Sequence, residues 1–382
     1  MKVAIVTESF LPTYNGVANS VLRVLDTLTQ QGHEALIIAP TTVGSNYLGH
    51  RVVKAPSMVI KGFEFGLPLA TMAAELEAFE PDVLHAASPV VLGGQALAMA
   101  SKMSIPSVAI YQTNIADYVE RHNFAIFRPA VERLMGAIHA PATVNLAPSP
   151  ESVRYLRDLG LSNIHQWGRG VDLELFAPRR RLSAEVAELK ARWAPNGERI
   201  VGYVGRLSAE KQVDRMAELF GAEGVAFVVV GDGPELPRLQ QEFASAPVTF
   251  TGKLSGDDLA NAYAAMDIFT HFGTEETFGQ TIQEAQASHL AVIAPNAGGP
   301  KHLIEHGVNG LLADPDAPSD YRRQLDHLLQ TPGLISQLQE QGRRSVLGRT
   351  WSAVNEQLLD HYRFAIELQS GQKQKVSARA VA

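Results

Sequence analysis

Residues 200 to 214 read IVGYVGRLSAEKQVD. The run 200–203 is short and rich in β-branched and aromatic residues, and glycine and charged residues follow it directly. This pattern is typical of a strand that is buried on both faces of a parallel sheet and ends in a loop. Comparable runs follow, each before a turn or a helical segment, at 226–230, 248–250, 268–272 and 290–294.

The first half of the chain shows the same rhythm, with helix-like stretches at 18–31 and 72–79 between apolar runs at 3–7, 35–39, 83–85 and 108–111. The repetition predicts two successive doubly wound α/β domains rather than one large sheet. We expect residues 1–170 to form the first domain and residues 171–354 the second, with the join inside HQWGRGVDLELFAP (165–178). Open α/β sheets bind ligands at the carboxyl ends of their strands, so the active site is expected in a cleft between the two domains.

The end of the chain divides into two parts. A helix at about 355–370 is expected to pack back on the first domain. Residues 371–382 are polar, small and basic, and they are expected to be a disordered tail.

Composition narrows the classes of protein further. The 382 residues carry a net charge of −7, which disfavours a nucleic-acid binder. No cysteine is present, so thiol nucleophiles, disulfides and thiolate metal sites are excluded. The start, MKVAIVTESF, leads straight into a strand pattern without the features of a signal peptide, and no run reaches the roughly 18 apolar residues of a membrane span. We expect a cytoplasmic protein whose membrane contact, if it has one, is peripheral.

Two cations follow the strand with which the second domain opens. Arg206 and Lys211 lie just beyond it, and a helix is expected to begin around Ser208. Fixed cations with helix amides suit a diphosphate, and the alternative is a solvated basic turn. Gly16 occupies a comparable place in the first strand-to-helix turn, where it is either a phosphate-binding glycine or an ordinary turn residue.

The segment ETFGQTIQEA (276–285) carries two glutamates eight residues apart. Thr277 and Gln280 have the spacing of a capping box, which predicts a helix from Thr277 whose first amides attract an anion. Glu276 then precedes the helix and Glu284 lies about 12 Å along it, too far away for a shared proton. The separation suits an elongated ligand with an anionic middle, such as a sugar nucleotide, and the alternative is a surface helix with two solvated glutamates.

Two patterns suggest metals but are interpreted otherwise. His302 to His306 matches H-x-x-E-H on one helical face, yet a turn follows at once and no third ligand is evident. Asp314-Pro-Asp316 resembles a D-x-D motif but lies in a proline turn. We therefore expect no metal site. A peripheral membrane patch is a further possibility, against ordinary surface and core, with its residues at Lys54, Lys61, Arg121, Arg128, Arg133, Phe63, Phe65, Phe124 and Phe127.

Several segments, in order, carry a resemblance that spans nearly the whole chain: the Gly16 turn, VGRLSAEKQVD, GDGPE, FTGKL, the Glu276 to Glu284 pair and APNAGGPKHLIEHGVNGLL. The chain resembles the retaining glycosyltransferases of family 4, with the GT-B fold of two Rossmann-like domains facing across a cleft. VTESFLPTYNGVANSVLRVL and GRGVD are most similar to actinobacterial GDP-mannose-dependent α-mannosyltransferases that act on glycolipids, including glucuronosyl diacylglycerol and phosphatidylinositol mannoside acceptors.

The resemblance implies a role for each matching position. Arg206, Lys211 and Glu276 would be the catalytic residues. Donor contacts are implied for Gly16, Lys253, Leu254, Phe278, Gly279, Gln280 and Glu284, with the diphosphate at Gly16, the base near residues 251–254 and the ribose at Glu284. Acceptor-side candidates are Tyr14, Asn15, Gln112, Thr113, Asn114 and Asp117. Many relatives have a histidine where this chain has Gln112, which cannot act as a base.

The expected function is a retaining, metal-independent transfer of mannose from GDP-mannose to a glycolipid at the cytoplasmic membrane face. The alternatives are a transferase that uses a UDP- or ADP-sugar with a soluble acceptor, and a non-catalytic sugar-binding protein. A dinucleotide oxidoreductase is disfavoured because no G-x-G-x-x-G follows the first strand.

Overall fold

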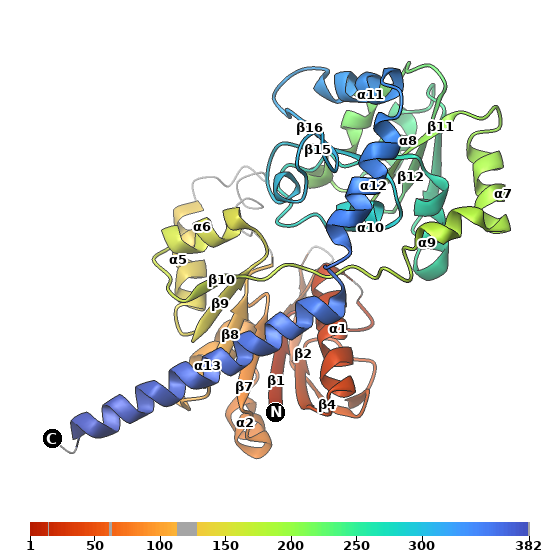
Figure 1. Cartoon of the computed structure of the whole chain (residues 1–382). Helices are drawn as coiled ribbons and strands as arrows, with labels where there is room; N and C mark the ends of the chain where they lie inside the picture. The colour runs from red at the N-terminus through yellow and green to blue at the C-terminus, as the bar shows by residue number, and fades with distance from the viewer. Residues whose placement is uncertain (14, 61–62, 113–127, 381–382) are drawn as a thin grey trace. The chain divides into compact units, whose positions relative to one another are not determined.

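The computed structural model describes residues 1–13, 15–60, 63–112 and 128–380, with side chains described outside 60–65 and 372–380. It divides into two compact units. The first unit comprises Met1–Arg169 and Ser352–Ala382, and the second comprises Gly170–Trp351. Each unit has its own sheet and its own core (Figure 1).

The first unit is built on an eight-stranded sheet in the order β10-β9-β8-β7-β1-β2-β4-β3. All neighbouring strands are parallel except β3 and β4. Its described elements are β1 (Lys2–Thr7), α1 (Gly16–Gln30), β2 (Glu34–Ala39), β3 (Asn46–Tyr47), β4 (His50–Lys54), β5 (Ser57–Ile60), β6 (Phe63–Gly66), α2 (Met72–Phe79), β7 (Val83–Ala87), α3 (Leu92–Lys102), β8 (Ser107–Ile110), α5 (Arg128–His139), β9 (Val144–Ala147), α6 (Pro150–Asp158), β10 (Ile164–Gln166) and α13 (Trp351–Ala380).

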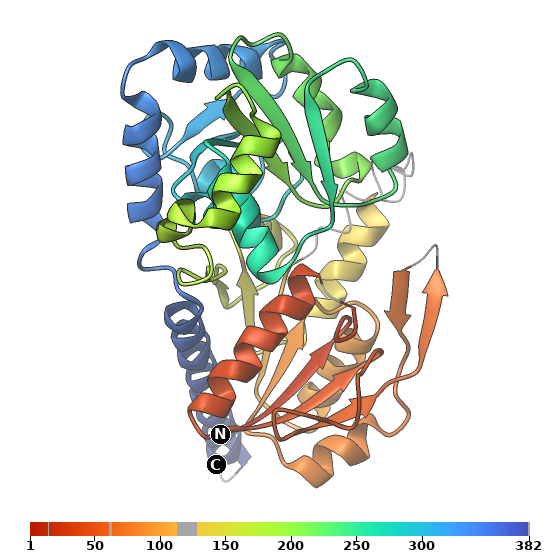
Figure 2. The ribbon, with the colours of Figure 1, turned by 90° about the vertical axis from the view of Figure 1, so that its right-hand side faces the viewer.

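The central strands of this sheet are buried on both faces, as their uninterrupted apolar sequences predict. One face packs against α1 and α13, and the other packs against α2 and α3. Strands β5 and β6 form a separate antiparallel hairpin beside the main sheet (Figure 2).

Helix α13 departs from the expectation for the end of the chain. It continues to Ala380, where the sequence analysis expected a disordered tail from residue 371. The physical reason is composition: Gln, Lys, Arg and Ala are good helix formers and can prolong an existing helix after Gly371. Its core-facing residues come earlier, with Leu358 and Tyr362 fully buried in the first unit.

The second unit has a six-stranded parallel sheet in the order β13-β12-β11-β14-β15-β16. Its elements are η3 (Pro178–Leu182), α7 (Ala184–Trp193), β11 (Arg199–Val204), η4 (Ala209–Lys211), η5 (Val213–Leu219), β12 (Val225–Val230), α8 (Leu236–Glu242), β13 (Val248–Gly252), α9 (Gly256–Ala265), β14 (Ile268–Thr270), α10 (Gln280–Ala287), β15 (Ala291–Pro295), η6 (Pro300–His302), β16 (Leu311–Ala313), α11 (Asp320–Gln330) and α12 (Leu334–Val346).

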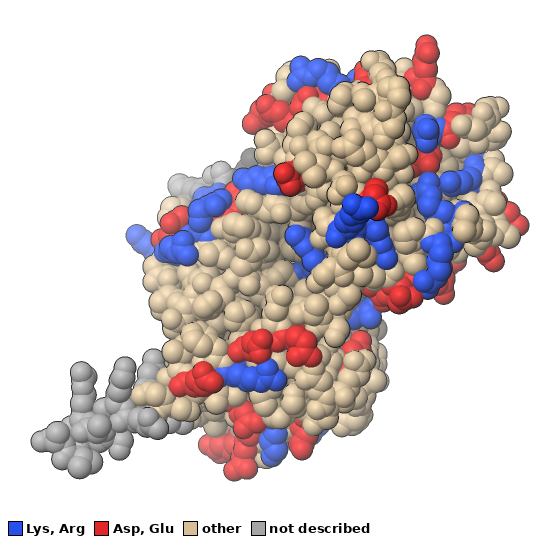
Figure 3. Space-filling model, viewed as in Figure 1, with Lys and Arg blue, Asp and Glu red and all other residues tan. Residues whose placement is uncertain are grey.

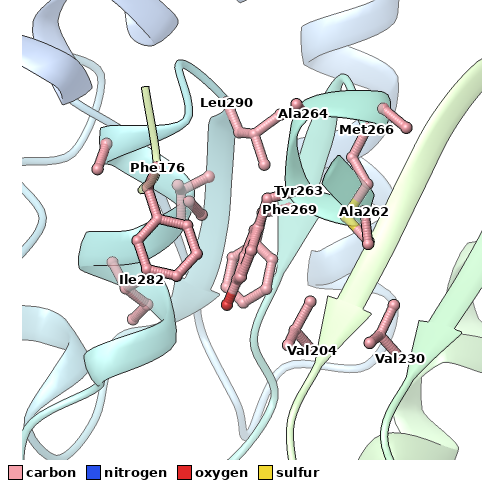
Figure 4. Packing of buried hydrophobic residues seen from close by; sticks show 14 of the residues in the cluster. Phe176, Val204, Val230, Ala262, Tyr263, Ala264, Met266, Phe269, Ile282 and Leu290 are labelled. Atoms are coloured by element: carbon pink, nitrogen blue, oxygen red, sulfur yellow. The ribbon is translucent and has the colours of Figure 1, made fainter. Parts of the chain in front are cut away.

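The core of the second unit lies on both faces of this sheet. On one face, α9 and α10 pack against the strands around Tyr263, Phe269 and Ile282 (Figure 4). The rings of Tyr263 and Phe269 have their centroids 5.9 Å apart. The close packing fixes α10, which carries two of the expected site residues.

The order of the strands indicates at which point of each sheet a ligand would be expected to bind. The chain of the second unit adds β12 and β13 on one side of β11 and then returns to add β14 on the other side. The loops that follow β11 and β14 therefore leave toward opposite faces, and such a switch point is where open α/β sheets bind ligands. In the first unit the corresponding pair is β1 and β7.

The surface and the helices add two observations. On the face that Figure 3 shows, basic and acidic side chains both occur over each unit. In the described part of the chain, no helix combines the length and the hydropathy that crossing a bilayer requires.

Candidate functional site at the switch point of the second unit

The loop after β11 is held by the turn that follows the neighbouring strand β12. Gly231 has a φ of +147°, and a Cβ at this position would lie 1.8 Å from the carbonyl oxygen of Gly205. A Cβ on Gly233 would lie 2.2 Å from the carbonyl oxygen of Leu207. The Leu207 amide donates to the carbonyl of Asp232 at 2.9 Å. GDGPE thus uses glycine because two backbones meet there without room for a side chain.

The same loop is joined to the loop after β14 by two side-chain contacts. Lys211 Nζ forms an ion pair with Glu276 Oε2, and both side chains are about a quarter exposed, at 24% and 23%. Gln212 Nε2 donates to Thr274 Oγ1 at 2.9 Å. The two expected catalytic residues thus meet across the switch point although they are 65 positions apart in the sequence.

The loop after β15 completes this edge. The Gly299 amide donates to the carbonyl of Glu276 at 2.6 Å. A Cβ on Gly298 would lie 2.4 Å from the carbonyl oxygen of Thr274, and one on Gly299 would lie 2.4 Å from the Phe278 nitrogen. The glycine pair in APNAGGP therefore lets its own backbone support the loop that carries Glu276.

The local helices differ from the sequence prediction in two places. Helix α10 begins at Gln280, not at Thr277, and its N-cap is Gly279 with a φ of +101°. A residue in the left-handed region cannot lie inside a right-handed helix, so the capping box does not form. After Ser208 the chain makes only two 3₁₀ segments, η4 and η5, because Gln212 between them also has a positive φ of 49°.

The second glutamate of the pair has its own partner. Glu284 Oε2 accepts a hydrogen bond of 3.0 Å from the hydroxyl of Tyr263. Burial and the Glu284 carboxylate both raise the pKa of Tyr263 well above its ordinary value, so the hydroxyl stays protonated and donates. The carboxylate of Glu284 on α10 therefore has a neutral donor as its partner, and it does not belong to the Lys211–Glu276 ion pair.

The other predicted donor residues have varied surroundings. Arg206 is exposed, and its carbonyl accepts from the hydroxyl of Tyr203 at 3.1 Å. Phe278 is buried in the core at 6% exposure. Gln280 Nε2 donates to the carbonyl of Gly170 at 3.0 Å.

Lys253 and Leu254 follow β13, at the far edge of the sheet from β14. Lys253 is exposed, whereas Leu254 packs against the core. Their role beside a nucleobase stays a prediction, as do the donor contacts of Arg206, Phe278, Gly279 and Gln280.

The predicted residues of the first unit gather at the start of α1. Asn15 is the N-cap, and its Oδ1 accepts from the amides of Val17 and Ala18, at 3.0 Å each. A Cβ on Gly16 would lie 2.6 Å from Arg169 Nη1, and Arg169 Nη2 donates to Gln112 Oε1 at 2.8 Å. The remaining acceptor-side candidates lie outside the described residues: Tyr14, Thr113, Asn114 and Asp117.

Sequence reasoning did not single out two charged residues of the first unit. Arg169 lies in GRGVD between two glycines, a signal comparable to that of Arg206 after Gly205. Glu8 follows β1 directly, and its Oε1 accepts from the amides of Val90 and Gly93 at 3.0 Å each. Burial raises the pKa of Glu8. Both residues lie at the carboxyl edge of the first sheet. Their positions in loops directly after strands would have been enough to name them as candidate site residues.

The two sequence patterns that resemble metal sites form turns and local hydrogen bonds in the structure. His302 ends the short η6 turn and His306 forms a bridge with Gly310, so the two histidines do not share a helical face as their spacing suggested. Asp314 Oδ1 accepts from the amide of Asp316 at 3.0 Å. Among the described residues, no group of three or more His, Cys, Asp and Glu is placed to hold a metal ion.

Comparisons with known proteins agree with this architecture. Residues 14–175 match the model of Glycosyltransferase Family 4, and residues 186–345 match that of Glycosyl transferases group 1. A GDP-mannose-dependent alpha-mannosyltransferase of Corynebacterium glutamicum is 42% identical over 387 residues, covering 96% of this chain and 90% of the relative. An enzyme of the same name from Mycolicibacterium smegmatis is 42% identical over 375 residues, covering 95% and 97%. The chain belongs to the family 4 glycosyltransferases.

The fold agrees with that membership. A sucrose-phosphate synthase from Thermosynechococcus elongatus has a similar structure, with a TM-score of 0.76 at 20% identity over 95% of this chain and 98% of that one. The expected GT-B fold, an α/β architecture with two parallel sheets, is confirmed.

Proposed function

We propose that this glycosyltransferase transfers mannose from GDP-mannose to a hydroxyl group of a glycolipid, with retention of configuration, at the cytoplasmic face of a membrane. The choice of GDP-mannose as the donor rests on one observation. The chain is 42% identical, over at least 95% of its length, to two enzymes named as GDP-mannose-dependent alpha-mannosyltransferases. At this level of identity over whole domains, the loops that contact the donor are expected to have the same function.

The second unit is proposed to hold the donor. Arg206 and Lys211 would neutralise the diphosphate, together with the first amides of α10, which have no partner within the helix. Glu276 would bind hydroxyl groups of the mannose, and Glu284 would bind the ribose. The ion pair between Lys211 and Glu276 is consistent with this arrangement, because the residue proposed to bind the phosphate lies beside the residue proposed to bind the sugar.

The reaction would proceed on one face of the sugar. The bond between the anomeric carbon and the β-phosphate oxygen breaks as the bond to the acceptor oxygen forms, and the acceptor proton passes to the leaving phosphate. GDP and the mannosylated acceptor are the products. Charge accumulates on the diphosphate in the transition state, so fixed cations and amide dipoles favour the transition state over the ground state. No metal ion is needed in this route, because the chain itself supplies the positive charge.

A route through a covalent intermediate on Glu276 is the alternative. A mannosyl group trapped on Glu276 after denaturation of the working enzyme would establish the covalent route instead.

The first unit is proposed to hold the acceptor, near Arg169 and Gln112, while Gly16 stays a proposed contact of the donor diphosphate. Two exposed apolar side chains support a lipid acceptor. Met58 and Val59 on strand β5 are 47% and 69% exposed, and Lys54 at the end of β4 precedes them closely in the sequence. Exposed apolar side chains are suited to insertion at a membrane interface.

The donor is tested by ligand-dependent stability. GDP, UDP and ADP are added separately at the same concentration and salt, and the unfolding temperature is measured. A ligand that binds only the folded state stabilises it by about 2.7 kcal/mol at a hundred times its Kd. We expect GDP to give the largest shift. A larger shift with UDP or ADP would assign another donor, and no shift with any nucleotide would contradict a transferase role at this site.

The acceptor is tested by product analysis. The enzyme is incubated with GDP-mannose labelled in the sugar, with and without vesicles of membrane glycolipid. Label that enters the lipid fraction with an α linkage supports the proposal. Label that enters only water-soluble products of added sugars would show that the acceptor is soluble.

A further inference from the structure

His271 lies next to the Lys211–Glu276 ion pair and was not among the predicted site residues. It follows β14 directly, and its side chain is only 3% exposed. Its backbone is fixed on both sides: the amide donates to Ile293 at 2.9 Å, and the carbonyl accepts from the hydroxyl of Tyr321 at 2.9 Å. The ring therefore has little freedom to move out of the site.

The imidazole is buried without the hydrogen bonds that it can make. Within the described residues, neither Nδ1 nor Nε2 of His271 has a partner of good geometry. The backbone of Gly273 is near enough to raise the pKa of the ring in the manner of a hydrogen bond, although the contact lacks the geometry of a full hydrogen bond. A buried polar group without a hydrogen-bond partner destabilises the folded state, so such a group beside the candidate site needs an explanation.

The ring shares its surroundings with the catalytic loops. A Cβ on Gly273 would lie 3.5 Å from His271 Nε2 and 3.5 Å from Lys211 Cα, so the ring and the Lys211 backbone flank the same spot. Burial lowers the pKa of His271 to about 4, while Glu276 acts to raise it and Lys211 to lower it. At neutral pH the ring is therefore uncharged, with one N–H donor and one acceptor.

The Lys211–Glu276 ion pair competes with the donor. The proposed function requires Lys211 to contact a diphosphate, yet its ammonium is engaged by Glu276. When Lys211 turns to the phosphate, Glu276 loses this partner in a half-buried place. An uncharged donor such as the His271 ring, on which Glu276 already acts electrostatically, would offset that loss without competing for the phosphate.

We propose that His271 is a positioning residue of the donor site, which donates a hydrogen bond to Glu276 when Lys211 exchanges Glu276 for the diphosphate. The inference rests on the proposed function, because it needs a diphosphate at Lys211. It explains why a buried imidazole with unused hydrogen-bonding capacity is kept beside an ion pair.

The test is a double-mutant cycle on the affinity for GDP, measured by titration calorimetry with the full chain. His271→Phe keeps a ring but removes the donor, and we expect GDP binding to weaken about tenfold, the usual value of a hydrogen bond to a charged group. Glu276→Gln removes the charge that needs the new partner. This variant should bind GDP about twofold to fivefold more tightly, since the competing ion pair is gone.

The two substitutions together distinguish positioning from general structural damage. In the Glu276→Gln background, His271→Phe should leave the GDP affinity unchanged within about twofold. His271→Asn or His271→Gln, whichever places its amide where the ring N–H lies, should restore at least part of the lost affinity in the wild-type background. Because these variants keep a polar side chain, they also serve if His271→Phe does not fold.

A matched control and two contradictory outcomes complete the experiment. His85→Phe removes another buried imidazole, in the first unit, and should lower stability without changing the GDP affinity. The role of His271 would be overturned if His271→Phe lowered the GDP affinity equally in the wild-type and Glu276→Gln backgrounds, or in neither. In both cases the proposed function would stand as long as the wild-type chain binds GDP. Failure of the wild-type chain to bind GDP would overturn the proposed function itself.

Discussion

His85, His139 and His271 are each at most 3% exposed, and burial lowers the pKa of all three. His85 shows the effect most clearly because its pKa falls to about 3 and burial is its only cause. Its Nδ1 lies 2.6 Å from the hydroxyl of Tyr362 on α13, so this contact joins the sheet of the first unit to the last helix.

The depressed pKa of His85 makes stability depend on pH. In the unfolded chain the imidazole binds a proton below about pH 6.5, whereas in the folded chain it stays neutral down to about 3. The unfolded state binds more protons in this window, so stability falls as pH falls. Between pH 7 and pH 5, His85 should cost about 2 kcal/mol, measured by urea unfolding.

Two variants check this origin. His85→Gln should lose that part of the pH dependence. Tyr362→Phe should keep it, because burial rather than the hydrogen bond sets the pKa. An unchanged slope in His85→Gln would show that another group is responsible.

At the scale of elements, the site consists of strand ends and the turns that support them. The turn after β12 supports the loop after β11, and the turn after β15 supports the loop after β14. The expected charged residues lie on the supported loops, while the glycines lie mainly on the supporting turns. The glycine motifs therefore reflect close backbone approach, and ligand binding by the charged residues stays a prediction.

Gly231→Ala tests this support. The added Cβ would lie 1.8 Å from the Gly205 carbonyl oxygen, and a backbone group cannot rotate away as a side chain can. We expect a loss of about 1–3 kcal/mol in the second unit, with a displaced β11 loop and weakened nucleotide binding. The loss is measured by denaturant unfolding.

Gly224→Ala is the matched control. Gly224 also has a positive φ, of +67°, but no atom of the described residues lies within 4 Å of its added Cβ. It should show only the conformational cost of about 1 kcal/mol and bind the nucleotide normally. Equal behaviour of the two variants would mean that the contact with Gly205 has no special importance.

At the scale of the whole molecule, the first unit is assembled from two distant stretches of chain. Val354, Leu358 and Tyr362 of α13 are buried among residues of β1, β2 and α1. Trp167 Nε1 donates to the carbonyl of Val354 at 2.9 Å, and Asn355 Nδ2 donates to the carbonyl of Arg23 at 2.8 Å. The core of the first unit thus includes residues from the end of the chain. In sequence, the whole second unit lies between the two stretches that form the first unit.

Truncation of the chain tests this dependence. A chain that ends at residue 353 loses several buried side chains, each worth about 1.5–3 kcal/mol, against a typical domain stability of 5–15 kcal/mol. We expect its first unit to be unfolded, measured by near-ultraviolet circular dichroism and limited proteolysis. A chain that ends at Ser370 keeps every α13 residue of this core and should melt as the full chain does. A folded first unit in the shorter chain would show that α13 is dispensable.

The sequence by itself determined the two-sheet fold, several strands of each sheet including the central ones, and most loops of the candidate site. These features depend on local patterns: uninterrupted apolar runs, glycines after strands and charges beyond them. The family resemblance added roles for single residues, and those roles stay predictions until ligands are measured.

Only the tertiary structure decided which of these residues meet. Lys211 pairs with Glu276 because β11 and β14 are neighbours in the sheet, and that order cannot be read from either segment. The start of α10 at Gln280, the contact of Arg169 with Gly16 and the burial of His271 were likewise not foreseen. Each depends on contacts between segments far apart in the chain, whose free energy exceeds the weak local preferences that a sequence pattern reports.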